Sequence, residues 1–163
     1  MVPLAPDWRY SGSVPKAKIS FTYNPVARRR IATFSGSIED GDLMGAYAEL
    51  LRDPEYDHGA DDLVDLRGVE RFGVTESGLR SIMALFAPVD QLGIPTRLAI
   101  VAPNDDVYGV SLMYQTLRSD DAPEQIAVFR DMDAAEDWLN RGAAERAKDR
   151  AARARGDDTP ASE

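Results

Sequence analysis

The sequence predicts an α/β fold in which about four helices cover a mostly parallel sheet of about five strands, and only the first strand is antiparallel. Three observations predict it. Short apolar runs alternate along the chain with segments that have helical periodicity. Single helices between successive strands are typical of parallel sheets. The first two extended runs are separated only by a turn signal, which indicates a hairpin.

The hairpin comes first. Apolar and polar residues alternate from Lys18 to Tyr23, the pair Asn24-Pro25 signals a turn, and a second extended run ends at Gly36. Three later apolar runs have the length and composition of buried parallel strands. These runs are residues 63–66, 97–102 and 126–129.

Four segments show the 3.6-residue periodicity of helices. Each begins at residues that cap a helix or complement its dipole. The expected beginnings are the acidic residues 39–42, Thr75, the run Asn104-Asp105-Asp106 and the capping-box pattern Asp133-Ala-Ala-Glu136. Pro54 and Pro88 are expected to close the first two helices, because proline cannot continue a helix.

The organisation predicted is a single domain with two extensions. Residues 1–17 form an extended arm that contains prolines, and residues 18–141 form the domain. Residues 142–163 form a charged Ala/Arg-rich tail, a solvated helix extension that becomes disordered by Gly156. A homodimer that forms through the arm, which contains Trp8, is an alternative to a monomer.

Composition excludes several classes of function. The net charge of the 163 residues is −9, and the acidic excess lies in residues 31–140, so neither nucleic acid nor an anionic membrane surface is an expected partner. The basic run Arg28-Arg29-Arg30 and the arginines of the tail are interpreted as solvated surface. No apolar run approaches the length of a membrane span, and the start has no secretion-signal pattern, so a cytoplasmic protein is expected.

Catalysis and cofactor binding are not expected. Cysteine is absent, so thiolate chemistry is excluded. His58 is the only histidine and would have to be the base of any serine triad, but the sequence has no Gly-x-Ser-x-Gly elbow. The glycines form neither a P-loop nor a dinucleotide fingerprint. Asp57, Asp61, Asp62 and Asp65 lie near His58, but one histidine among aspartates is a thin ligand set, and no metal is expected. A small hydrolase or isomerase that uses these acids is the least favoured alternative.

Several short motifs occur in an order that resembles a known family. The motifs are Phe34-Ser-Gly36, Asp53-Pro-Glu-Tyr56, Leu63-Val-Asp-Leu-Arg-Gly-Val69, Arg97-Leu-Ala-Ile-Val-Ala-Pro103, Val107-Tyr-Gly109, Met113-Tyr-Gln115, Val128-Phe-Arg-Asp131 and Ala135-Glu-Asp-Trp-Leu139. Together they span residues 18–140 and resemble the SpoIIAA-like branch of the STAS superfamily. The resemblance implies the STAS fold and a non-enzymatic regulatory or ligand-binding module.

Two functions follow from the resemblance. In the anti-sigma antagonists of the family, a serine before Gly-Leu is phosphorylated, which implies Ser77, or Thr75 beside it, as a switch read by a regulatory protein partner. Residues alone favour a simpler role for Thr75, the N-cap of the second helix. The same branch is similar to CRAL-TRIO lipid-transfer domains, which implies a carrier of a small apolar or lipid-like ligand.

A ligand groove is expected at the carboxyl ends of the parallel strands, where open α/β sheets generally bind ligands. The third helix beside these ends carries more large apolar side chains than one buried stripe needs. The candidate groove residues are Asp65, Arg67, Val74, Tyr108, Leu112 and Met113.

Overall fold

The computed structural model describes residues 18–118 and 121–156. The predicted arm, residues 1–17, and the last residues of the predicted tail lie outside the described residues. Strands and helices follow one another in the predicted order. The strands are β1 (Ile19–Asn24), β2 (Arg29–Glu39), β3 (Asp61–Gly73), β4 (Thr96–Val101) and β5 (Glu124–Phe129). The helices are α1 (Asp40–Leu51), α2 (Glu76–Asp90), α3 (Asp105–Leu117) and α4 (Met132–Ala154).

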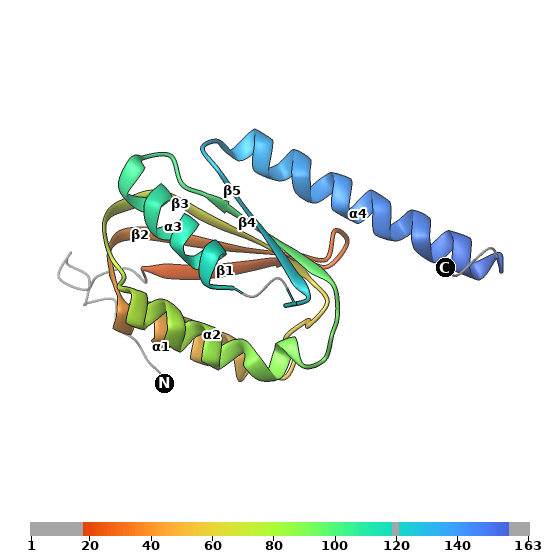
Figure 1. Cartoon of the computed structure of the whole chain (residues 1–163), viewed down its shortest axis with the longest axis horizontal. Coiled ribbons are helices and arrows are strands. Elements are labelled where there is room, and N and C mark those ends of the chain that lie inside the picture. The colour runs from red at the N-terminus through yellow and green to blue at the C-terminus, as the bar shows by residue number, and fades with distance from the viewer. Residues whose placement is uncertain (1–17, 119–120, 157–163) are drawn as a thin grey trace, which may run out of the picture.

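The strands form one sheet in the order β1-β2-β3-β4-β5. β1 pairs antiparallel with β2, and each of the other neighbouring pairs is parallel. The predicted fold class is therefore confirmed. Helices α1, α2 and α3 cover one face of the sheet, whereas α4 packs on the other face and runs on past the sheet (Figure 1).

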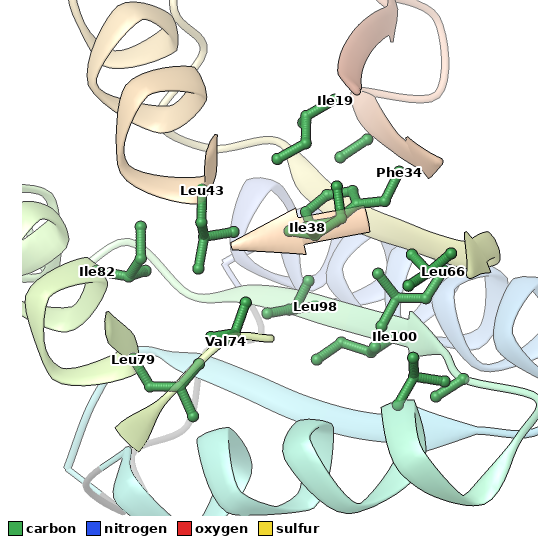
Figure 2. Packing of buried hydrophobic residues seen from close by; sticks show 14 residues of the cluster. Ile19, Phe34, Ile38, Leu43, Leu66, Val74, Leu79, Ile82, Leu98 and Ile100 are labelled. Carbon is green, nitrogen blue, oxygen red and sulfur yellow. The ribbon is translucent and has the colours of Figure 1, made fainter. Parts of the chain in front are cut away.

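Side-chain alternation along the strands divides the core between these two faces. In β4, Leu98 and Ile100 belong to the larger cluster beneath α1, α2 and α3. Ala99 and Val101 belong to a smaller cluster that includes Leu139 of α4. Figure 2 shows the labelled residues of the larger cluster, which converge from strands and helices: Ile19, Phe34, Ile38, Leu43, Leu66, Val74, Leu79, Ile82, Leu98 and Ile100.

The helix beginnings follow the predicted caps in two places. The Thr75 side chain accepts a hydrogen bond from the Gly78 N–H at 3.1 Å, and the Asn104 side chain accepts one from Val107 at 3.1 Å. Both residues have the extended backbone of an N-cap. The N-cap predictions at Thr75 and Asn104 are confirmed.

The predicted beginning of α4 is wrong by two residues. Asp131, not Asp133, is the N-cap, and its carboxylate accepts a hydrogen bond from the Ala134 N–H at 2.9 Å. β5 ends at Phe129, and Asp131 lies directly before Met132, the first residue of α4, which is the N-cap position. Asp133 lies in the first turn, where its charge complements the helix dipole.

The predicted end of α2 at Pro88 is also wrong. The helix continues to Asp90 with Pro88 inside its last turn. Proline removes one N–H donor at its own position. The neighbouring bonds form nonetheless, among them the one from the Gln91 N–H to the Ala87 carbonyl at 3.1 Å.

β3 is longer than the predicted run of residues 63–66. It continues to Gly73 because β2 pairs with it along this whole length, with register shifts near Ser35 and Ser37. Arg67 and Glu70 are exposed in this extension, so the sequence there lacks the apolar run of a buried strand.

Helix α4 crosses the domain boundary expected at residue 141. Gly142 is buried, and Arg146 forms an ion pair with Asp61, which is 1% exposed at the start of β3. The first turns of the predicted tail therefore dock on the sheet. Within the described residues, no helix is long and apolar enough to span a membrane.

Candidate functional site

A cavity of about 90 Å³ lies between the sheet and helices α1, α2 and α3. We call it the main cavity. A cavity of about 10–15 Å³ holds one buried water, so the main cavity has room for several waters or for part of a small ligand. Its apolar lining comprises Phe34, Leu43, Leu50, Val64, Leu66, Phe72, Leu79, Ile82, Phe86, Leu98, Ile100 and Val110. Its polar lining comprises Arg30, Tyr47, Asp62, Ser111, Tyr114 and Glu124.

Three charged side chains reach the main cavity from the amino ends of the parallel strands. Arg30 and Asp62 are the second residues of β2 and β3, and Glu124 is the first of β5. Since side chains alternate along a strand, Arg30 shares the helix-covered face with Phe34, and Asp62 shares it with Leu66. The register pairs Arg30 directly with Asp62.

The Arg30 and Asp62 side chains form a buried bidentate ion pair. Arg30 Nε and Nη2 donate to the two Asp62 carboxylate oxygens at 2.7 and 3.0 Å. The Arg30 side chain is 5% exposed and that of Asp62 is 21% exposed. The guanidinium also lies over the Tyr56 ring, 4.2 Å from its centre. Burial raises the pKa of the Asp62 carboxyl, and the Arg30 charge acts against this shift.

Glu124 lies beside a second buried guanidinium. Arg118 donates to Glu124 Oε1 at 3.2 Å and to both oxygens of Asp90 at 2.9 and 3.1 Å. Burial, together with the nearby Asp62 charge, raises the pKa of Glu124 to about 8. Glu124 is therefore largely protonated at neutral pH. We call Arg30, Asp62, Asp90, Arg118 and Glu124 the polar cluster.

Two tyrosines line the main cavity next to the polar cluster. Tyr47 of α1 packs edge-on against Phe21 and Phe86, with ring centres 5.1 and 5.8 Å away, and Tyr114 comes from α3. Burial raises the pKa of both phenols, so they stay neutral. Neither hydroxyl forms a hydrogen bond with another residue in the described part of the chain. Both are free to hydrogen-bond with a guest.

A second cavity of about 20 Å³ lies on the other side of the polar cluster. Arg30, Asp62, Phe86 and Glu124 line both cavities. The small cavity is also lined by His58, which is exposed. These four side chains therefore form a wall between the main cavity and a space that borders the protein surface.

The candidate groove residues lie elsewhere. None of the six lines the main cavity. Asp65 and Arg67 pair with each other in β3 at 2.9 and 3.0 Å, and Val74 is part of the buried core. The guanidinium carbon of Arg130 lies over the Tyr108 ring, 3.9 Å from the ring centre. Leu112 and Met113 are exposed, at 38% and 37%. An open depression at the carboxyl ends of β3 and β4, lined by residues 69–72 and 104–107 and by Val110, contains none of the six.

The two candidate phosphorylation residues differ in their surroundings. The Thr75 hydroxyl donates to Asp40 Oδ2 at 2.6 Å while it accepts the cap hydrogen bond from Gly78. Ser77 is exposed in the first turn of α2. Thr75 therefore acts as the N-cap, and phosphorylation of Ser77 or of Thr75 stays a prediction.

The acids near His58 bind separate arginines. The four pairs are Asp57 with Arg28, Asp61 with Arg146, Asp62 with Arg30, and Asp65 with Arg67. Asp61 and Asp62 are neighbours in β3, so their side chains point to opposite faces of the sheet. In residues 18–118 and 121–156, no three metal-ligating side chains gather at one point.

The sequence interpretation missed Arg30, Asp62 and Glu124. It assigned Arg30 to a solvated basic run, and this is wrong because Arg30 is 4% exposed. A signal was present: each of the three occupies the strand position that, by alternation, faces the helix-covered core. Charged residues at such positions are buried only with partners, and the partners come from distant parts of the chain.

Comparisons with known proteins give the following. No family model matches the sequence, and no curated protein matches it. The fold is similar to a crystal structure of an uncharacterized protein from Shewanella loihica PV-4, which is described as a DUF3478 family protein with a SpoIIAA-like fold. The two are 15% identical, with a TM-score of 0.48, over 74% of this chain and 91% of that one.

Proposed function

We propose that the protein is a non-enzymatic cytoplasmic module that binds a small apolar ligand in the main cavity. The observation that carries the proposal is the cavity itself, a space beneath three helices with twelve apolar residues in its lining. Ligand sites are typically concave and mostly apolar, with a few polar groups that fix orientation. The polar cluster at one end of the main cavity supplies such groups.

The expected energetics favour an apolar molecule with several carbons to bury. Each buried methylene contributes roughly 0.8 kcal/mol, so a chain of several carbons can offset the cost of ordering the ligand. Small alkyl compounds that share one chain length and differ in their polar ends are therefore suitable probes. We use 1-octanol as the neutral member of the set.

Regulation through a protein partner is the second candidate. It is favoured by the exposure of Ser77 in the first turn of a 15-residue helix, where backbone N–H groups and the dipole favour a phosphate. Phosphopeptide mapping of the protein from its own host distinguishes a modified Ser77 from an ordinary residue of the first turn.

Filling the main cavity should abolish ligand binding. Val110 of α3 lines the cavity, and Val110→Phe adds a ring to that space. We expect the affinity for 1-octanol, measured by isothermal titration calorimetry, to fall at least about tenfold, or 1.4 kcal/mol. Overpacking costs about 1–3 kcal/mol of stability, so a thermal melt must accompany the titration.

Leu112→Phe is the matched control. It makes a similar change two residues along the same helix, at an exposed side chain. Its affinity for 1-octanol should equal that of the parent protein. If Leu112→Phe weakens binding and Val110→Phe does not, the ligand lies in the groove predicted from the sequence and the main cavity is the wrong site.

A further inference from the structure

We propose that the ligand of the main cavity is a cationic amphiphile whose protonated amine lies next to Glu124. This inference rests on the proposed function and specifies the chemical class of the ligand. It follows from three features of the polar end of the main cavity. These are the balance of charge, the groups that are free to bond, and the groups that are already engaged.

The polar cluster contains more carboxylates than guanidiniums. Asp62, Asp90 and Glu124 face two cations, Arg30 and Arg118. Arg30 is matched by Asp62, and Arg118 is shared between Asp90 and Glu124. With every group ionised, one negative charge is left without a partner. A buried charge of this kind is unfavourable unless a cation enters or the group takes up a proton.

The free bonding capacity faces the cavity. Glu124 lines it and binds Arg118 through Oε1 only, so its second carboxylate oxygen has no side-chain donor in the described part of the chain. Tyr47 and Tyr114 line the same space, and their hydroxyls form no hydrogen bond within the described part of the chain. An alkylammonium carries three N–H donors. Glu124 and the two phenol oxygens provide acceptors for them.

An anionic head group lacks comparable partners. The Arg30 guanidinium donates to Asp62 through Nε and Nη2, to the Tyr56 hydroxyl at 3.0 Å and to the Asp57 carbonyl at 3.4 Å. Arg118 donates through Nη1 and Nη2 to Asp90 and Glu124. Its Nε has no hydrogen-bond partner in the described part of the chain, but the residue does not line the main cavity. A carboxylate at this end brings a negative charge without a cationic partner into a region of low dielectric.

Binding of an amine should release a proton. The charged and titratable groups around Glu124 come from several elements. They are Arg30 of β2, Asp62 of β3, Tyr47 of α1, Tyr56 and His58 between α1 and β3, Asp90 of α2, and Tyr114 and Arg118 at the end of α3. The free protein holds Glu124 protonated below a pKa of about 8. A bound cation favours the ionised form, so Glu124 loses its proton on binding. Affinity for an amine therefore rises with pH from 6 to 8.

The test compares octylamine, 1-octanol and octanoate on the full chain by isothermal titration calorimetry. At pH 7.5 we expect octylamine to bind at least about tenfold more tightly than octanoate. Between pH 6 and 8 its affinity should rise by up to about tenfold per pH unit. The amine itself stays charged, because alkylamines such as the lysine side chain titrate near about 10.4. Titrations in two buffers of different ionisation enthalpy should show proton release.

Glu124→Gln identifies the responsible group. We expect this variant to lose both the preference for octylamine over 1-octanol and its pH dependence. Glu136→Gln, at an exposed position of α4, is the control and should change neither. If Glu124→Gln does not fold, proton release by the parent protein decides the question.

The outcomes separate the two proposals. Binding of 1-octanol with no preference for octylamine, or with octanoate bound most tightly, overturns the amine and leaves the apolar site in place. Failure of all three compounds to bind overturns the proposed function as well. If Glu124→Gln still binds octylamine in preference to 1-octanol, another group binds the amine and the inference is contradicted.

Discussion

Replacing Arg30 with methionine is expected to lower the free energy of unfolding by about 3–5 kcal/mol. The substitution removes the guanidinium that is paired with Asp62, whose carboxylate lies at the end of an apolar cavity. Removing one partner of a buried ion pair leaves the other charge without compensation. Urea denaturation followed by circular dichroism measures the change.

Two controls accompany this prediction. Arg80→Met breaks an exposed pair with Glu76 on α2, with both side chains more than half exposed, and should cost less than about 1 kcal/mol. The double variant Arg30→Met with Asp62→Leu removes both charges and should recover most of the loss. A loss of the same size in Arg80→Met and Arg30→Met, or no recovery in the double variant, contradicts a buried ion pair at this position.

Leu139→Ala is expected to destabilise the protein by about 2–5 kcal/mol. Leu139 is fully buried between α4 and the sheet, against Leu63, Ala99 and Val101. Truncation leaves a cavity beneath the one described helix on that face. Leu92→Ala is the matched control, since Leu92 is 55% exposed and should change stability by less than about 0.5 kcal/mol. Equal effects of the two variants mean that α4 does not dock through Leu139.

Most of the fold could be predicted from local patterns. The alternation that begins at Lys18 and the run of residues 97–102 each report the burial of their own strand, so the element order and strand polarity followed. The full length of β3 could not be predicted. Its second half is held by pairing with β2, and its exposed Arg67 and Glu70 carry no apolar signal. Such residues belong to the strand because they pair with a neighbouring strand, and a local sequence pattern does not report that pairing.

The candidate site could be predicted far less well. The residue patterns predict a groove at the carboxyl ends of the strands, whereas the polar end of the main cavity lies at their amino ends, with Arg30, Asp62 and Glu124. Register alone brings Arg30 beside Asp62, since 31 residues separate them in the chain. From its immediate sequence neighbours alone, each of these two residues would be assigned to the solvent-exposed surface. Their burial becomes visible only when the face of each strand is compared with its apolar neighbours.

A methyl-resolved NMR titration of the protein with 1-octanol tests whether a ligand binds in the main cavity. The two faces of the sheet supply an internal control. We expect the methyl signals of Leu43, Ile82 and Ile100, which line the main cavity, to shift with a common saturation curve. Those of Leu63 and Leu139 on the opposite face should stay in place. Shifts confined to Leu112 and Met113, or no saturable shift at Leu43, Ile82 and Ile100, would contradict ligand binding in the main cavity.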